Sequence, residues 1–326
     1  MSVLVVGGAG YIGSHTAKAL AASGREVAVL DNLSTGHEEF LRWGEFVRAD
    51  ILDDPASLAA LLAERGVKAV MHFASLIQVG ESMAEPGSYY RTNLCGVLNL
   101  LEGMRNAGVD KLIFSSSAAV YGNPRSVPLT EDHPLLPINP YGWTKRMAEQ
   151  MMADFGAAHG LRSVSLRYFN AAGASADGEI GEWHDPESHL IPIVLDAALG
   201  RREHVAVYGD DYDTPDGTCV RDFIHVEDLA EAHLLALERL EEGGESAAYN
   251  LGVGSGRSVL EVIETVRGVT GRPVEVVTAD RRPGDPPRLV ASSSRAESEL
   301  GWRPVKGLEE MVESAWKWHR NLHHQG

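Results

Sequence analysis

The sequence predicts an α/β protein with a doubly wound parallel sheet, followed by a smaller C-terminal α/β lobe. Strand-like and helix-like segments alternate through the first half of the 326 residues, a glycine cluster follows the first of them, and the composition changes beyond Phe169. Alternation of this kind is typical of parallel strands whose crossover helices cover both faces of one sheet.

The strands predicted for the first half are short apolar runs, and the helices carry the spacing of an amphipathic face. Strands are expected at Ser2–Val6, Glu26–Leu30, Glu45–Arg48, Lys68–Phe73, Lys111–Ser115 and Leu161–Leu166. Helices are expected at Tyr11–Ser23, Pro55–Glu64, Thr92–Asn106 and from Pro140 to about His159. Gly24 suits the position after the first helix, and Asn139-Pro140 form the N-cap and N1 pair of the last.

The second half differs in composition and in the regularity of its apolar pattern. Residues 171–189 are rich in Gly, Ala, Asp and Pro and predict an ordered loop over a site. Further elements are expected from Ile191, at Val220–Val226 (strand), Asp228–Leu240 (helix), Ser258–Thr270, Val274–Val277 and Leu308–His319. We predict one domain at 1–170, to which 222–250 return, and a substrate-binding lobe made of 171–221 and 251–326.

Composition and charge exclude several classes of protein. The net charge of -17 argues against nucleic-acid binding, and no apolar run is long enough to span a membrane. The N-terminus lacks the regions of a signal peptide. Cys95 and Cys219 have no His or Cys at ligand spacing, so we expect neither a disulfide framework nor a metal site, and a cytoplasmic setting. An anionic substrate would need a local cluster of Arg or Lys.

The glycine cluster follows the first strand and opens the first helix, as the phosphate-binding turn of a Rossmann-type dinucleotide domain does. Its pattern is G-x-x-G-x-x-G, with the three spaced glycines at Gly7, Gly10 and Gly13. Asp31 ends the second strand, where an acid binds the adenosine ribose and repels a 2′-phosphate, which favours NAD over NADP. Asp50 and Ile51, after the third strand, suit an adenine contact.

A Y-x-x-x-K pair near the start of the helix at Pro140 suits proton transfer. Four-residue spacing places Tyr141 and Lys145 on one helix face. We expect the ammonium, together with a positive nicotinamide ring, to lower the pKa of the Tyr141 phenol. Ser117 follows a strand, at the sheet edge where open α/β proteins bind ligands, and can share a proton with Tyr141 and a substrate hydroxyl.

With these residues in place, the chain resembles the extended short-chain dehydrogenase/reductase family, and over essentially its whole length the UDP-glucose (UDP-galactose) 4-epimerases of that family. The strings that carry the resemblance are Asp31-Asn32-Leu33, His72-Phe73-Ala74, Val79-Gly80-Glu81-Ser82, Phe114 to Gly122, Pro140-Tyr141-Gly142, Arg167-Tyr168-Phe169-Asn170, Val220 to Val226, Tyr249-Asn250-Leu251-Gly252 and Arg281-Arg282-Pro283-Gly284-Asp285. Each string is modest alone, whereas their order and spacing together are specific.

The resemblance implies a set of contacts for NAD and another for the substrate. Besides the glycines, the implied NAD contacts are Tyr11, Ile12, Asp31, Asn32, Asp50, Ile51, Phe73, Ala74, Asn93, Ser115, Tyr141, Lys145 and Phe169. Ser117 and Tyr141 would hold the 4-hydroxyl of the sugar. The implied contacts to the nucleotide diphosphate are Asn170, His189, Leu190, Ala206, Tyr208, Arg221, Arg282 and Asp285. Arg221 and Arg282 are guanidinium forks suited to an anionic diphosphate in so acidic a chain.

The activity implied is interconversion of UDP-galactose and UDP-glucose by transient oxidation at C4, in a homodimer with NAD retained. Related 4,6-dehydratases carry an Asp-Glu pair after the strand-end serine or threonine, where this chain has Ala118 and Ala119. A non-catalytic NAD-sensing regulator typically lacks the Tyr or the Lys, and both are present.

The chain also departs from the family pattern. Val6 replaces a common Thr, Ile77 replaces a Lys found in some members near the cofactor, and Ala119 and His189 stand where a hydroxyl residue and an Asn are found in others. The resemblance implies that Leu289 occupies the position that gates the space beside the sugar's 2-substituent. Because leucine is intermediate in size, we expect UDP-galactose to be preferred, with weaker activity on N-acetylated UDP-sugars left open.

Overall fold

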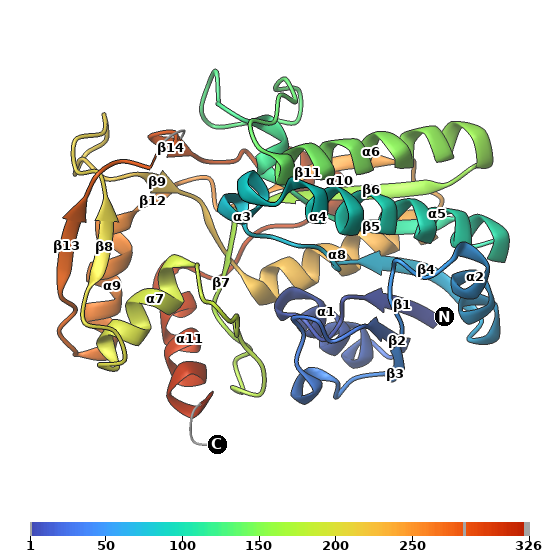
Figure 1. Ribbon diagram of the computed structural model, residues 1–326, viewed down its shortest axis with the longest axis horizontal. Helices are drawn as coiled ribbons and strands as arrows, with labels where there is room; N and C mark the ends of the chain where they lie inside the picture. Colours follow the sequence, from blue (N-terminus) through green and yellow to red (C-terminus); the bar gives the residue numbers. More distant parts are fainter. Residues whose placement is uncertain (1, 283–284, 323–326) are drawn as a thin grey trace.

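The computed structural model describes residues 2–282 and 285–322, and its centre is a seven-stranded parallel sheet (Figure 1). The strand order is β11-β6-β5-β4-β1-β2-β3, and each neighbouring pair is parallel. The strands are β1 (Ser2–Val6), β2 (Glu26–Asp31), β3 (Glu45–Arg48), β4 (Val67–His72), β5 (Lys111–Ser117), β6 (Arg162–Tyr168) and β11 (Ala247–Leu251). The predicted doubly wound fold class is confirmed, and its order reverses between β1 and β4.

Helices cover both faces of this sheet because the strand residues that point to either face are apolar. Val3 and Val5 of β1 belong to the core beneath α1 (Tyr11–Ala22) and α8 (Val226–Glu241). Leu4 and Val6 belong to the core beneath three other helices, α2 (Pro55–Glu64), α5 (Gly96–Ala107) and α6 (Pro140–His159). Strands buried on both faces in this way read as continuous apolar runs, as β1 does.

A smaller region forms around three short sheets. The pairs and triplet are β7 (Asn170–Ala172) with β10 (Phe223–His225), β8 (Val205–Tyr208) with β13 (Val276–Ala279), and β9 (Val220–Arg221) between β12 (Arg257–Ser258) and β14 (Arg288–Leu289). Strands β8, β9 and β13 lie at the end of the molecule away from the main sheet, and β7 lies between the two regions (Figure 1). Helices α7 (Leu190–Ala198), α9 (Val259–Thr270) and α11 (Leu308–Leu322) share a separate apolar core there.

Several elements differ from the sequence expectation. The strand predicted at Val220–Val226 is broken at Asp222, whose carboxylate accepts hydrogen bonds from the backbone N–H groups of Val253, Gly254 and Ala291. The helix predicted from Thr92 begins as a π-helix, η2 (Tyr90–Cys95). Elements not predicted are η1 (Glu38–Phe40), α3 (Val79–Ala84), α4 (Pro86–Tyr89), η3 (Ala118–Tyr121), α10 (Ser294–Leu300), the main-sheet strand β11, and the short strands β7, β8, β12 and β14.

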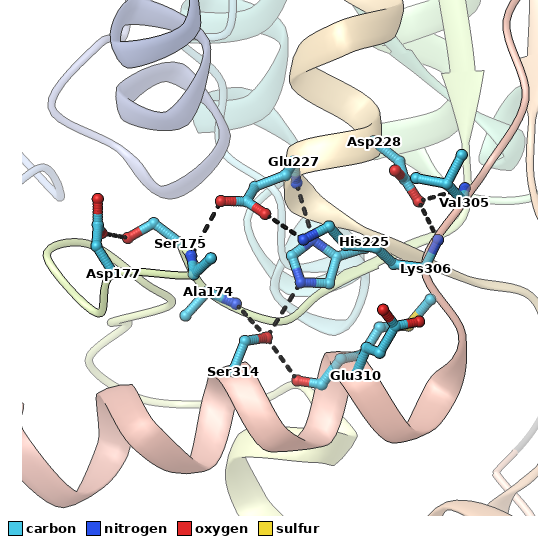
Figure 2. A network of polar contacts seen from close by, with 12 residues as sticks. Ala174, Ser175, Asp177, His225, Glu227, Asp228, Val305, Lys306, Glu310 and Ser314 are labelled. Atoms are coloured by element: carbon cyan, nitrogen blue, oxygen red, sulfur yellow. Dashed lines mark hydrogen bonds and ion pairs between the residues drawn. The ribbon is translucent and has the colours of Figure 1, made fainter.

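A polar network ties the loop after β7 to α8 and α11 (Figure 2). His225 Nε2 lies 3.1 Å from Ser314 Oγ, which also accepts the Ala174 N–H at 3.1 Å. Glu227 accepts from the Ala176 N–H at 3.0 Å and from Lys306 Nζ at 2.6 Å. Ser314 of α11 and Glu227 of α8 therefore both fix the loop at residues 174–176, ahead of the segment that begins at residue 182.

Neither cysteine is paired: Cys95 is exposed and Cys219 is buried. Within residues 2–282 and 285–322, no helix combines the length and apolar character needed to cross a bilayer.

Candidate active site

The proposed proton-transfer residues lie where β5 ends and α6 begins. Ser117 is the last residue of β5, and Tyr141 stands in the first turn of α6. Asn139 caps this helix by accepting the Gly142 N–H at 2.8 Å. A Cβ on Gly142 would lie 2.5 Å from the Ala119 carbonyl oxygen, so only glycine lets the helix approach the turn after β5 this closely.

Ser117, Tyr141 and Lys145 come together, but they are not joined in one chain of contacts. The Ser117 hydroxyl lies near enough to the Tyr141 phenol to act on its pKa, and it accepts the Ala119 N–H at 3.1 Å. Lys145 Nζ donates to the Ser115 carbonyl oxygen at 2.9 Å and lies 5.8 Å from the centre of the Tyr141 ring. Lysine thus approaches the phenol from the side of β5 without touching its hydroxyl.

Without cofactor or substrate, the pKa of Tyr141 does not shift in the direction that the sequence predicts. Burial raises the pKa of Tyr141, and the neighbouring Ser117 hydroxyl only partly opposes it. Burial also lowers the pKa of Lys145 to about 7, although the Glu149 carboxylate pulls it upward. The predicted lowering of the Tyr141 pKa is therefore not found in the polypeptide by itself, because burial penalises the charged form of both residues.

A buried ion pair behind Lys145 was not predicted. Glu149 accepts from Arg167 Nη2 at 2.7 Å and Nε at 2.9 Å, and from Ser116 Oγ at 2.7 Å. Arg167 also donates to the Tyr121 hydroxyl at 3.0 Å. Glu149 follows Lys145 by four residues on one face of α6, and that spacing is the signal by which it could have been found.

The glycine turn has the shape that a pyrophosphate requires. Gly7 has φ +82°, and a Cβ there would lie 2.5 Å from the Ala74 nitrogen; one on Gly13 would lie 2.2 Å from the Gly7 oxygen. A Cβ on Gly10 would meet only the Gly7 oxygen, at 3.4 Å, so this side of the turn is open. The two outer glycines therefore shape the turn, and the middle one leaves room for a ligand at the N-terminus of α1.

Backbone hydrogen bonds orient the Asp31 carboxylate beside this turn. Its Oδ2 accepts the Ala9 N–H at 2.9 Å and its Oδ1 accepts the Leu33 N–H at 2.8 Å. Each oxygen keeps a second lone pair for a ribose hydroxyl. These residues therefore fit NAD.

The other predicted cofactor residues gather along the same edge, at the carboxyl ends of the parallel strands or on the elements that follow. Asn32 donates to Asp50 at 2.8 Å, joining the ends of β2 and β3. Asn93 accepts the Leu76 N–H at 2.8 Å and so fixes the segment after β4. The remaining members of the set are Tyr11, Ile12, Ile51, Phe73, Ala74, Ser115 and Phe169.

The predicted diphosphate residues fall into neighbouring groups in the smaller region. Asn170, His189 and Leu190 line one small hollow. Arg221 pairs with Asp285 at 3.0 Å and stands opposite Leu289 in the β9–β14 ladder. In the third group, on β8 and the segment after β13, the Arg282 guanidinium lies 3.9 Å from the centre of the Tyr208 ring, and Ala206 lies two residues before Tyr208. Pro283 and Gly284 of the same string lie outside the described residues.

Asp222 connects the first two of these groups through its backbone. Its carbonyl oxygen accepts from the Asn170 N–H at 3.2 Å and from Asn170 Nδ2 at 3.0 Å. Its own N–H donates to the Leu289 oxygen at 3.0 Å. The break that Asp222 makes between β9 and β10 thus sets the positions of residues on both sides.

A cluster of two histidines and two glutamates in the loop before α7 was also missed. The side chains of Glu182, His184, Glu187 and His189 offer ligand atoms that all lie within 4.8 Å of one another. His189 Nδ1 lies 2.5 Å and His184 Nδ1 lies 3.4 Å from Glu182 Oε1. The sequence predicts no metal site, so this cluster stands outside that prediction. The close spacing of these four ionisable residues in the sequence is the signal that could have revealed the cluster.

The cluster has strongly shifted charge states. Burial opposes the positive charge of each histidine, but the neighbouring carboxylates outweigh it and raise both pKa values, that of His184 to about 10. Burial would raise the pKa of Glu182, yet the two imidazole rings outweigh it and lower it to about 2.

Known proteins resemble this chain along its whole length. A profile of the "NAD dependent epimerase/dehydratase family" matches residues 3–252. The UDP-glucose 4-epimerase of Rhizobium meliloti is 53% identical over 325 residues, 100% of this chain and 99% of the relative. That of Halalkalibacterium halodurans is 52% identical over 325 residues, 99% of this chain and 97% of the relative.

Solved structures agree with the sequence relatives. UDP-glucose 4-epimerase from Brucella ovis in complex with NAD has a TM-score of 0.95 and 52% identity, covering 97% of both chains. The epimerase from Stenotrophomonas maltophila with bound NAD and formylated UDP-arabinopyranose has a TM-score of 0.97 and 43% identity, covering 100% of both chains. The chain therefore belongs to the NAD dependent epimerase/dehydratase family and, within it, to the NAD-dependent UDP-glucose 4-epimerases.

Proposed function

We propose that this protein interconverts UDP-galactose and UDP-glucose by transient oxidation at C4 of the hexose. The observation that carries the proposal is the meeting of Ser117 and Tyr141 at the end of β5, on the sheet edge that also bears the glycine turn and Asp31. An open α/β sheet binds its ligands at this edge, close to where the strand order reverses.

In this proposal each residue has a distinct task. NAD supplies the acceptor and donor of the hydride at C4. Tyr141 takes the 4-hydroxyl proton on its phenolic oxygen and later returns it, while Ser117 Oγ orients that hydroxyl. Lys145 adds positive charge behind the phenol when it is protonated, which favours the phenolate that proton removal requires. The diphosphate residues hold the UDP half away from the reacting ring, so the sugar can present either face.

Leu289 supports a preference for sugars with a small 2-substituent. Its side chain packs on the cluster formed by Ala118, Val120, Tyr121 and Leu129, which begins beside Ser117. We propose that UDP-galactose is turned over faster than UDP-N-acetylgalactosamine. Replacing Leu289 by Ala is expected to narrow the difference in kcat/KM between the two substrates, and Leu289→Tyr to widen it. Equal rates in the unaltered protein would contradict the preference.

One assay separates the proposed activity from its alternatives. Purified protein is incubated with UDP-galactose and no added cofactor, and UDP-glucose is expected as the product because NAD stays bound. A 4-keto-6-deoxy product would indicate dehydration instead, although Ala118 and Ala119 stand where dehydratases carry an acid pair. No turnover even with added NAD would favour a regulatory protein.

We also propose a cytoplasmic homodimer formed through α5 and α6. Val97 and Leu101 of α5 are buried in the core against the sheet, whereas Leu98 of α5 and Met147 of α6 keep 39% and 37% of their surface exposed. Exposed apolar side chains on two adjacent helices suit a helix-pair interface. Light scattering should give twice the chain mass for the unaltered protein and the single chain mass for Leu98→Glu with Met147→Glu.

A further inference from the structure

We infer that Glu182 is a positioning residue for substrate binding: it fixes the ring of His189 so that only the protonated imidazolium can donate a hydrogen bond to the diphosphate. This inference rests on the proposed function, in which His189 contacts the UDP half of the substrate. It assigns a task to a buried acid that neither the proton transfer nor cofactor binding uses.

Glu182 holds the His189 ring at Nδ1, whereas the Nε2 edge of the ring faces away from that carboxylate. The residue is the N-cap of α7, where Glu187 Oε1 accepts its backbone N–H at 2.8 Å. Its Nδ1 lies 2.5 Å from Glu182 Oε1, and the Glu182 side chain is only 4% exposed. The His189 side chain is 40% exposed and lines the hollow that it shares with Asn170. Among the described residues, no hydrogen bond reaches its Nε2.

This arrangement dictates which form of the ring can bind an anion. A carboxylate at Nδ1 requires a proton there, because it can only accept. In the neutral ring Nε2 then carries a lone pair, which repels a phosphate oxygen. Only the imidazolium offers an N–H on that side, and hydrogen bonds from charged donors to phosphate are the stronger kind. Binding therefore depends on His189 holding its second proton.

The surrounding groups favour that proton. Burial opposes it, but the Glu182 carboxylate, with help from Glu187, raises the pKa of His189 above its ordinary range, although His184 opposes them. Two carboxylates and two imidazoliums leave the cluster with no net charge. The other titratable groups around the cluster are Tyr11 of α1, His319 of α11, and Asp196 and Arg201, which act on His319. Burial keeps both the Tyr11 phenol and the His319 ring neutral near pH 7.

The same four side chains could instead bind a divalent cation such as zinc, for which carboxylates and imidazoles are suitable ligands. The two readings exclude each other at His189, because a metal on Nδ1 would displace the proton shared with Glu182. The test therefore includes the metal content of the purified protein.

The experiment measures the dissociation constant of UDP-galactose between pH 6 and 9, by calorimetry, in NAD-loaded Tyr141→Phe protein so that turnover does not interfere. Glu182→Gln in this background keeps the shape of the side chain but removes its charge. We expect binding at pH 8 to weaken by roughly ten-fold. The pH at which affinity falls should also shift downward, because burial then acts on His189 without its counter-charge.

Three controls make the outcome specific. Glu179→Gln removes an exposed carboxylate of the same loop and should leave affinity and pH profile unchanged. His189→Asn supplies a neutral donor and should bind with little pH dependence. Adding Glu182→Gln to His189→Asn should then cost less than two-fold, because Glu182 acts only through His189. An NMR titration of the His189 ring, identified by its loss in His189→Asn, reports the pKa shift directly.

The inference is overturned if Glu182→Gln leaves both the affinity and the His189 titration unchanged, if it weakens binding equally in the His189→Asn background, or if the protein contains stoichiometric zinc that Glu182→Gln removes. Failure of the proposed function is a different result. In that case the protein without substitutions does not turn over UDP-galactose, and none of the variants binds it.

Discussion

The two halves of the proposed site prepare for their ligands differently. On the cofactor side, strand ends and a glycine turn place backbone groups, and Asp31 is oriented by two backbone N–H groups with a lone pair to spare on each oxygen. On the diphosphate side, long side chains from small sheets carry the charge, and the chain's own acids already pair with them, as Asp285 does with Arg221. On the cofactor side, NAD would bind to groups that still have free lone pairs. On the diphosphate side, the diphosphate would replace a carboxylate, such as that of Asp285, as the partner of an arginine.

The largest expected effect lies between the two halves, where the chemistry occurs. Tyr141→Phe should lower kcat by roughly 10²–10⁴-fold, the contribution typical of a general acid or base. Folding, NAD content and the dissociation constant of UDP should stay near their original values, since the ring remains packed. Near-normal turnover would remove Tyr141 from the proton path.

On the cofactor side, two glycine-to-alanine substitutions should affect different properties: one the stability of the NAD-free protein, the other the affinity for NAD. Gly13→Ala places a Cβ 2.2 Å from the Gly7 oxygen and should destabilise the NAD-free protein by about 1–3 kcal/mol. Gly10→Ala meets only one atom, at 3.4 Å, and should leave the melting temperature of the NAD-free protein unchanged while NAD affinity falls markedly. Thermal denaturation with and without NAD distinguishes them; equal melting temperatures for the two NAD-free variants would contradict the assigned roles.

On the diphosphate side, the expected loss is smaller and appears in KM. Arg221→Lys cannot keep the contacts that the guanidinium makes with Asp285 and the Pro286 oxygen, so KM should rise by roughly ten-fold with kcat within two-fold. Arg257, the β-ladder partner of Arg221, gives a matched control: Arg257→Lys is expected to change neither parameter. A fall in kcat alone would place Arg221 at the chemistry instead of the anchor.

The last expected effect falls on stability without NAD and not on turnover. The pKa of Lys145 in the folded protein is about 7, below its ordinary 10.5. Between these values the unfolded chain binds more protons, so this group makes stability rise with pH in that window. Lys145→Met should therefore flatten the dependence of unfolding free energy on pH between 7 and 9. The unfolding free energy is measured by urea denaturation at each pH. If its slope against pH is the same in Lys145→Met as in the unaltered protein, Lys145 keeps its proton in the folded protein.

The same contrast explains what the sequence could predict. The bounds of α6 were expected from Asn139 to about His159 because its cap, its proline and its closing glycine are local signals. β8 was missed because it is four residues long and its partner, β13, lies near residue 276. The cofactor residues fall at strand ends that apolar runs already mark, whereas the diphosphate residues could be assigned only through family resemblance.

Charge states escaped prediction for a related reason. Spacing places Lys145 beside Tyr141, but the sign of each pKa shift depends on burial, which the spacing does not report. The cluster around Glu182 is compact in the sequence, yet its importance comes from the depth at which that carboxylate lies. A burial estimate for each acid would have been needed to recognise it.

The position of β11 has a consequence for synthesis. This strand, at residues 247–251, completes the edge of the main sheet beside β6, and α8 covers one of its faces. We propose that 222–250 belong to the domain begun by 1–170. A chain that emerges N-terminus first then cannot close its cofactor half until about three quarters of it has been made. From the completion of β6 until that point, β6 is an unprotected edge, so premature termination between residues 168 and 251 would release an aggregation-prone fragment in place of a working NAD-binding module.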